Sequence, residues 1–157
     1  MNVKKQLKVG VNQGDGEPPF RWNVVLLDLA MKEGSSFLDD AQYHHVAEQV
    51  QELARETDPT HSATQRVAGV EDFFELKDKG GPLGRINVRV FFFLDKRFTA
   101  IVVLGAIFKQ NEGKTPESDK VRMGRRKRKY LQGDYGDPAL FIQIDPGKRI
   151  SKRRRKK

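Results

Sequence analysis

The sequence predicts one small α+β domain, because segments with strand patterns and segments with helix patterns follow one another along 157 residues. The apolar run at 22–28 is typical of a short first strand, and apolar residues at helical spacing follow at about 38–56. Further strands with short connections are expected at 71–78, 85–94 and 98–109. Short links favour a meander, so we expect a small antiparallel sheet with a C-terminal helix.

The first helix is predicted from apolar residues that recur every three or four positions. They are Phe37, Leu38, Ala41, Val46, Val50, Leu53 and Ala54. Asp39 and Asp40 fall in the first turn, where the helix dipole stabilises negative charge. Asp58–Pro59 ends the pattern, and 58–70 is expected to be a connection with at most one short helical turn.

The three later strands differ in the pattern of their apolar residues. Residues 71–78 are rich in phenylalanine, and a turn containing glycine and proline follows them. In 85–94 the side chains alternate between two faces, so Arg89, Phe91 and Phe93 share one face. These phenylalanines are expected either to stack on bases or to pack under a helix. The segment 98–109 is apolar almost throughout, which indicates a central strand buried on both sides.

The last helix is predicted from its end signals. Thr115 suits the N-cap, Pro116 suits the first helical position, and Glu117 lies at the positive end of the dipole. The helix is expected to run to about Gln132, with Gly133 as its stop.

The chain is expected to divide into a flexible arm at 1–20, a folded domain at 21–133 and an extended basic tail at 134–157. Residues 122–129 hold six Lys and Arg, residues 148–157 hold eight, and neither run contains an acid. Outside them, sixteen Lys and Arg face twenty-one Asp and Glu, which is a net charge of −5. Basic runs bind phosphate polymers by releasing counterions, although a solubilising tail is the simpler alternative.

The composition excludes several classes of function. Without cysteine there is no disulfide, thiolate nucleophile or Cys-ligated metal. His44, His45 and His61 lack metal-site spacing, and no P-loop, dinucleotide fingerprint or nucleophile elbow occurs, so neither a metal nor a cofactor is expected. No run of about 20 apolar residues and no signal-peptide core are present, so we expect a cytoplasmic protein without a membrane partner.

Four short motifs occur in order along the predicted sheet and last helix. They are Glu75-Leu76-Lys77, Arg89-Val90-Phe91-Phe92, Phe108-Lys109 and Thr115-Pro116. This set resembles the RelE/HigB-like toxins of bacterial toxin–antitoxin modules, and most closely their phage-derived branch, over about residues 21–132. Lys77 stands where the family usually has arginine, and Gln110 stands where many members have a second lysine.

The resemblance implies an endonuclease that cuts mRNA in the ribosomal A site without a metal. The 2′-hydroxyl of the RNA attacks the adjacent phosphorus, so the site needs a proton acceptor, a proton donor and positive charge. The implied catalytic residues are Arg89, Lys77 and Lys109, with Arg89 on the scissile phosphate. The alternatives are that Arg89 pairs with Glu75 across the sheet and that the lysines are ordinary solvated strand ends.

The basic last helix extends the prediction to RNA binding. The expected RNA-binding residues are Arg85, Arg122, Arg125, Arg126, Arg128 and Tyr130. Few acids near the helix cluster can pair with it, which favours contact with phosphate. Arg85 fits a polar loop residue equally well, and Tyr130 is alternatively a packing residue at the helix end.

Three functions fit these patterns. The first is a ribosome-dependent mRNA endonuclease toxin that inhibits translation and is neutralised by a separate helix-turn-helix antitoxin protein. The second is a gyrase-inhibiting toxin of the same fold, and the third is a non-catalytic nucleic-acid-binding protein. Because the family contains both nucleases and gyrase inhibitors, membership alone does not fix the target.

Overall fold

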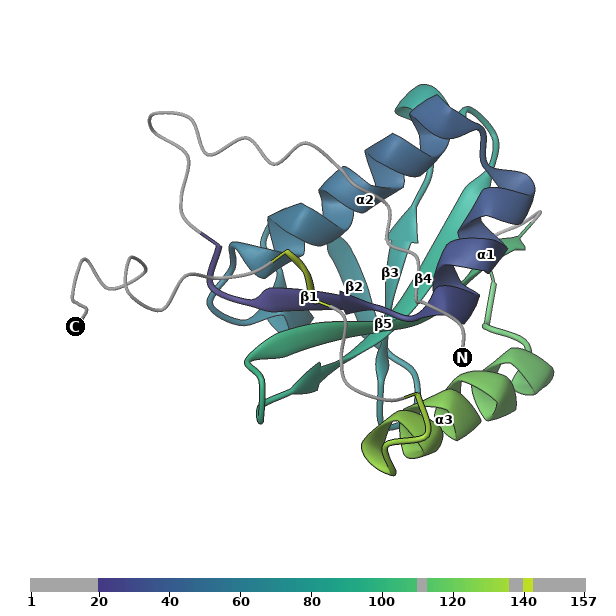
Figure 1. The fold of residues 1–157 in the computed structure, drawn as a ribbon. Helices are drawn as coiled ribbons and strands as arrows, with labels where there is room; N and C mark the ends of the chain where they lie inside the picture. The colour runs from purple at the N-terminus through teal and green to yellow at the C-terminus, as the bar shows by residue number, and fades with distance from the viewer. Residues whose placement is uncertain (1–19, 110–112, 136–139, 143–157) are drawn as a thin grey trace.

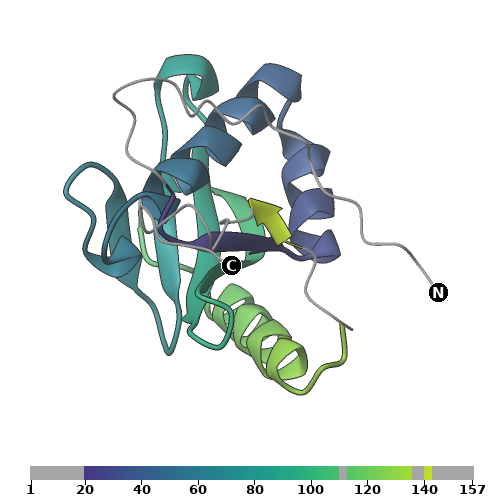
Figure 2. The same cartoon turned by 60° about the vertical axis from the view of Figure 1, so that its left-hand side comes forward.

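The computed structural model describes residues 20–109, 113–135 and 140–142, and it has the α+β architecture expected from the sequence. Its strands and helices are β1 (Asn23–Leu26), α1 (Asp28–Phe37), α2 (Asp40–Ala54), β2 (Arg66–Gly69), β3 (Phe74–Asp78), β4 (Asn87–Asp95), β5 (Ala100–Lys109), α3 (Glu117–Leu131) and β6 (Leu140–Ile142). One sheet has the strand order β2-β3-β4-β5-β1-β6. The helices α1 and α2 cover one face of it and α3 covers the other (Figures 1 and 2). Among these described elements, no helix has the length and apolar character that crossing a membrane requires.

The predicted meander is confirmed, because β3, β4 and β5 pair antiparallel in sequence order. The sheet as a whole is mixed, since β1 pairs parallel with β5 and Asn23 lies opposite Ala100. The expectation of a wholly antiparallel sheet is wrong at this pair. After β1 the chain crosses one face of the sheet through α1 and α2 and reaches the edge strand β2, and the meander then brings β5 back beside β1.

Two elements lie outside the sequence prediction. The helix α1 precedes the expected helix and carries Gly34, Ser35 and Ser36, which weaken its intrinsic propensity. Gly34 has a packing reason, because a Cβ there would lie 3.2 Å from Cε2 of Tyr43. The connection 58–70 contains the expected helical turn and also β2, which extends the meander by one strand.

The second helix begins where the acidic pattern indicates. Asp39 is its N-cap, with a carboxylate that accepts from the backbone N–H of Gln42 at 2.8 Å. In return the side chain of Gln42 accepts from the backbone N–H of Asp39 at 3.0 Å. This capping box satisfies two otherwise unpaired N–H groups and fixes the break between α1 and α2.

The face under α3 is built from alternate residues of β4. Phe91 packs edge-to-face on Phe73 with ring centroids 6.1 Å apart, and Phe93 packs in the same way on Tyr130 at 5.7 Å. All four side chains are buried. Phe91 and Phe93 are therefore core residues under a helix, and they are not available to stack on bases.

A β-bulge in β5 accompanies the close approach of α3. Phe91 lies opposite Gly105 while Phe92 lies opposite Val103, so Leu104 is an extra residue between them. A Cβ on Gly105 would lie 2.5 Å from Cε of Met123 and 2.6 Å from Nη1 of Arg126. A larger residue at 105 would displace the buried side chains of Met123 and Arg126, and such a close approach is a known reason for glycine within a strand.

We predict that Gly105→Ala destabilises the protein by about 1–3 kcal/mol, because the added methyl overpacks a buried contact. Urea denaturation measures the change. Gly124→Ala on α3 is the matched control, since a Cβ there meets no atom closer than 3.6 Å and alanine favours the helix. Equal stability of Gly105→Ala and the wild type would contradict the close docking of α3.

Candidate functional site

A cleft of about 530 Å³ lies where the β2–β3 hairpin, β4 and the start of α3 meet. Its charged lining residues are Glu75, Lys77, Arg89, Lys114 and Lys120. Four of them are cations and one is a carboxylate, so the cleft attracts anions.

The pairing of β3 with β4 brings two of the predicted catalytic residues into this cleft. Lys77 lies directly opposite Arg89, and opposite residues share a face of the sheet. Lys109 belongs to the same face, since it lies opposite Asn87 two residues before Arg89. Its Nζ donates to the carbonyl oxygen of Lys114 at 3.2 Å, so Lys109 supports the loop before α3 and does not line the cleft.

Arg89 forms the floor of the cleft and is only 3% exposed. Its Nη1 donates to Oε1 of Glu75 at 3.1 Å, and its Nη2 donates to the carbonyl oxygen of Gly113 at 3.0 Å. The hydroxyl of Thr115 donates to the same Glu75 oxygen at 2.5 Å. Of the two predicted roles of Arg89, the structure therefore shows the one in which it pairs with Glu75. The guanidinium also links the loop before α3 to the sheet.

The cleft also holds two lysines that sequence reasoning missed. Lys114 belongs to the loop that Arg89 holds, and Lys120 lies at the start of α3. Neither belongs to a motif, and each is an ordinary surface residue by type. Their closeness to Thr115-Pro116 was the available signal, because that dipeptide marks where the chain turns from the end of β5 into α3.

The start of α3 differs slightly from its prediction. The N-cap is Pro116 and the helix begins at Glu117, with no side-chain cap. Thr115, which we expect to be the cap, is buried and uses its hydroxyl on Glu75. The Thr115 hydroxyl thus bonds to the buried Glu75 carboxylate and does not cap the helix.

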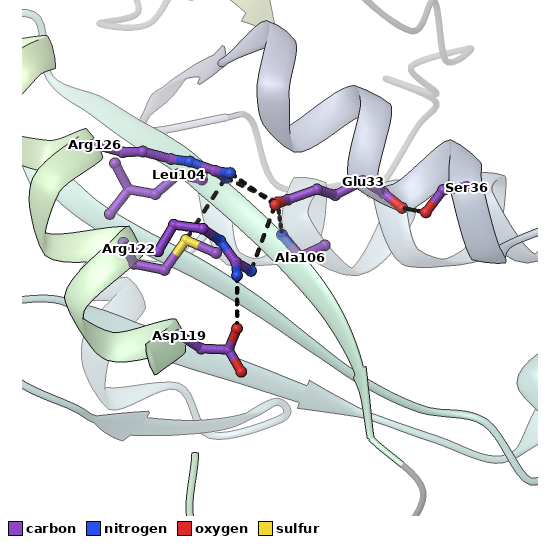
Figure 3. Close-up of polar contacts among 8 residues, drawn as sticks. Glu33, Ser36, Leu104, Ala106, Asp119, Arg122 and Arg126 are labelled. Atoms are coloured by element: carbon purple, nitrogen blue, oxygen red, sulfur yellow. Dashed lines mark hydrogen bonds and ion pairs between the residues drawn. The ribbon is translucent and has the colours of Figure 1, made fainter. Parts of the chain in front are cut away.

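Arg126 corrects the predicted RNA-binding set, because the residue is only 8% exposed and its guanidinium is engaged in an ion pair (Figure 3). Nη1 donates to Oε1 of Glu33 at 2.8 Å and Nη2 donates to Oε2 at 2.7 Å. Nη1 also donates to the carbonyl oxygen of Leu104, the extra residue of the bulge, at 2.9 Å. Glu33 further accepts from the backbone N–H of Ala106 at 3.0 Å. One carboxylate thus joins α1, β5 and α3.

Two more residues of the predicted set serve the packing of α3. Arg122 lies 2.9 Å from a carboxylate oxygen of Asp119 and 3.5 Å from one of Glu33. Tyr130 is buried, and burial together with the Asp95 carboxylate raises the pKa of its hydroxyl. Tyr130 therefore matches the packing alternative, and Arg122 is engaged by two carboxylates.

The exposed cations of α3 form a strip on its outer side. The strip consists of Arg125, Arg128 and Lys129, which are spaced three and four residues apart. Within the described ranges no ion pair engages any of these three side chains. Arg85 is also exposed, in the turn between β3 and β4 and outside the cleft lining.

The histidines form no catalytic or metal centre with the cleft. His45 on α2 lies 3.2 Å from Oδ2 of Asp78 at the end of β3, and burial raises the pKa of this aspartate while His45 lowers it. Among the residues whose positions are described, no three His, Asp or Glu side chains gather as metal ligands.

We predict that Glu33→Gln destabilises the protein by about 3 kcal/mol, because it leaves the buried Arg126 guanidinium without its counter-charge. Thermal and urea unfolding measure the change. Glu117→Gln is the matched control, since its carboxylate is 79% exposed and 3.7 Å from Lys120, and its loss costs less than about 0.5 kcal/mol. Equal losses in the two variants would contradict the structural role given to Glu33.

Comparison with known proteins adds no relative to this description. No protein-family model matches the chain, and no curated protein matches it either. The RelE/HigB-like assignment therefore stands as a proposal that rests on the four motifs and on the geometry of the cleft.

Proposed function

We propose that this chain is the toxin of a toxin–antitoxin module and that it cleaves mRNA in the cleft without a metal ion. The observation that carries the proposal is the convergence of Lys77, Lys114 and Lys120 on one cleft, whose lining carboxylate Glu75 is already paired with Arg89. The motifs of the RelE/HigB-like resemblance support it, because they supply Lys77, Arg89 and the loop that enters α3.

In the proposed reaction, phosphorus exchanges its bond to the 5′-oxygen for a bond to the adjacent 2′-oxygen of the same RNA. The 2′-hydroxyl gives its proton to a water molecule and bonds to phosphorus, the bond to the 5′-oxygen breaks, and that oxygen gains a proton. The products are a 2′,3′-cyclic phosphate and a 5′-hydroxyl. Cations at Lys77, Lys114 and Lys120 stabilise the extra negative charge on phosphorus. Lys77, which is half-buried, is the candidate proton donor to the 5′-oxygen.

In this proposal Arg89 is a positioning residue. Its donors are taken by Glu75 and Gly113, so it holds the loop that carries Lys114 and does not itself grip the scissile phosphate. Lys109 acts on the same loop through the carbonyl oxygen of Lys114. The two predicted catalytic residues thus set the position of a third cation.

The partners follow from the distribution of charge. The strip of Arg125, Arg128 and Lys129 is proposed to contact ribosomal RNA while the cleft holds mRNA. A helix-turn-helix antitoxin, as the resemblance implies, would neutralise the protein by placing carboxylates on the same cations.

A second candidate function is a protein that binds RNA and performs no chemistry. The observation that favours it is the buried Glu75–Arg89 pair, which leaves the floor of the cleft close to neutral. A binder needs only the surrounding lysines and the strip on α3.

We predict that induced expression of the wild-type protein arrests bacterial growth and produces new in-frame cuts in a translated mRNA. The double variant Lys77→Ala/Lys114→Ala is expected to lower cutting by about 100-fold or more, because it removes charge that stabilises the transition state. Primer extension measures the cuts. Lys96→Ala, in the exposed β4–β5 hairpin, is the matched control and keeps full activity.

Absence of cuts from the wild type would refute the nuclease. Growth arrest without cuts then indicates the gyrase-inhibiting alternative, and RNA binding without arrest indicates the non-catalytic protein.

We also predict that the strip on α3 contributes to RNA affinity through phosphate contacts. Arg125→Ala/Lys129→Ala is expected to reduce the slope of log K against log salt by about 1.4, because two single-strand phosphate contacts are lost. Fluorescence anisotropy with a labelled single-stranded RNA measures the slope. Lys32→Ala, on α1, is the control, and an equal change in both variants would contradict a specific contact by the strip.

A further inference from the structure

A second hollow, of about 280 Å³, adjoins the cleft along α3. Lys120 lines both, so the two hollows are adjacent, and the second lies between the β2–β3 turn and the first half of α3. We propose that this hollow holds an unstacked base of the nucleotide next to the phosphate in the cleft, and that it prefers a base with an exocyclic amino group. The inference rests on the proposed RNA ligand and adds a base-recognition site to it.

The wall of the hollow is held in place by one side chain of α3. Nζ of Lys127 donates to the carbonyl oxygen of Asp72 at 2.6 Å and lies 3.3 Å from a carboxylate oxygen of the same residue. The same Nζ lies 4.9 Å from the centre of the Phe93 ring, within the range of a cation–π contact. The turn is therefore fixed against α3, and the hollow is formed before any ligand arrives.

The inner side of the hollow has space beside Gly124 and Val121, while most of the other side chains that line it are charged. Gly124 has no side chain there, and a Cβ at that position would meet only Nη1 of Arg128 at 3.6 Å and Cε2 of Phe73 at 4.0 Å. Val121 lines the same hollow and is 49% exposed, although its neighbours on α3 are mostly charged. A flat base in this gap would cover Val121.

The rim of the hollow supplies the polar contacts. Arg128 is exposed on one side, and its planar guanidinium can stack on a base. Glu71 and Glu117 lie on the rim as exposed carboxylates, which accept hydrogen bonds and donate none. A cytosine, adenine or guanine presents an amino group to such acceptors, whereas the corresponding group of uracil is a carbonyl oxygen that they repel.

Cytosine and uracil test this preference most sharply, because they have the same size and differ at position 4 by an amino group against a carbonyl oxygen. Fluorescence anisotropy compares labelled eight-residue oligocytidine and oligouridine, both 2′-O-methylated so that they cannot be cut. We expect the wild-type protein to bind the oligocytidine about fivefold more tightly, the size of one hydrogen-bonded contact.

Four variants test whether the preference comes from the hollow. Gly124→Met fills it and is expected to bring the affinity ratio close to one. Glu71→Ala removes one of the two rim acceptors and is expected to lower the ratio. Gly124→Ala is the matched control and keeps the ratio. Lys77→Ala weakens binding of both oligonucleotides equally, because it acts on the phosphate.

A wild-type ratio of one, or a ratio that survives both Gly124→Met and Glu71→Ala, overturns the base site while the cleft still binds RNA. Failure of the wild-type protein to bind either oligonucleotide contradicts the proposed function itself, and the base site with it.

Discussion

The carboxylate of Glu33 is the contact on which the arrangement of this protein depends. The strand β1 covers only the first four residues of β5, from Ala100 to Val103, so the rest of that edge of β5 lacks β1 as a partner. Glu33 extends from α1 to this edge, takes the N–H of Ala106 and binds the guanidinium of Arg126. A single side chain thus replaces part of a missing strand and links the helices on the two faces of the sheet.

The cleft depends indirectly on the same Glu33–Arg126 ion pair. Its charged residues come from three separate parts of the chain: β3, β4 and residues 114–120, which lead into α3 and form its first turn. Gly105 and the bulge at Leu104 let α3 come close to β5, and the Glu33–Arg126 pair holds it there. At the other end the Glu75, Arg89 and Thr115 contacts tie the start of α3 to β3 and β4. The helix is therefore fixed at both ends, with the cleft between its start and the sheet.

The sequence predicts the parts of this structure that depend on neighbouring residues. The meander and the acidic start of α2 follow from local spacing, whereas the shared face of Lys77 and Arg89 depends on the register of β3 against β4. The helix α1 does not follow from local spacing, because its glycine and serines are poor helix formers and its reason to fold is packing beside Tyr43. The parallel pairing of β1 also depends on residues far along the chain.

The cations on α3 show more clearly that contacts between residues far apart in the chain cannot be predicted from local spacing. By sequence alone, Arg125 and Arg126 are neighbours of identical type. One is exposed and the other is buried because helical geometry turns Arg126 toward a carboxylate 93 residues earlier in the chain. Counting charges along a helix overestimates the surface that is free to bind phosphate, since acids from distant elements neutralise part of it.

The parallel pairing of β1 with β5 has a consequence for how the chain reaches its native state. Asn23 can pair with Ala100 only after the chain between them has been brought together. Closing so long a loop is slow, because the entropy is lost before the stabilising contacts form. During synthesis β1, α1 and α2 are made well before the strand that they cover. Their apolar faces remain exposed in this interval, and chaperones recognise surfaces of this kind. The cleft is completed last, when α3 follows β5, so a partially synthesised chain lacks it.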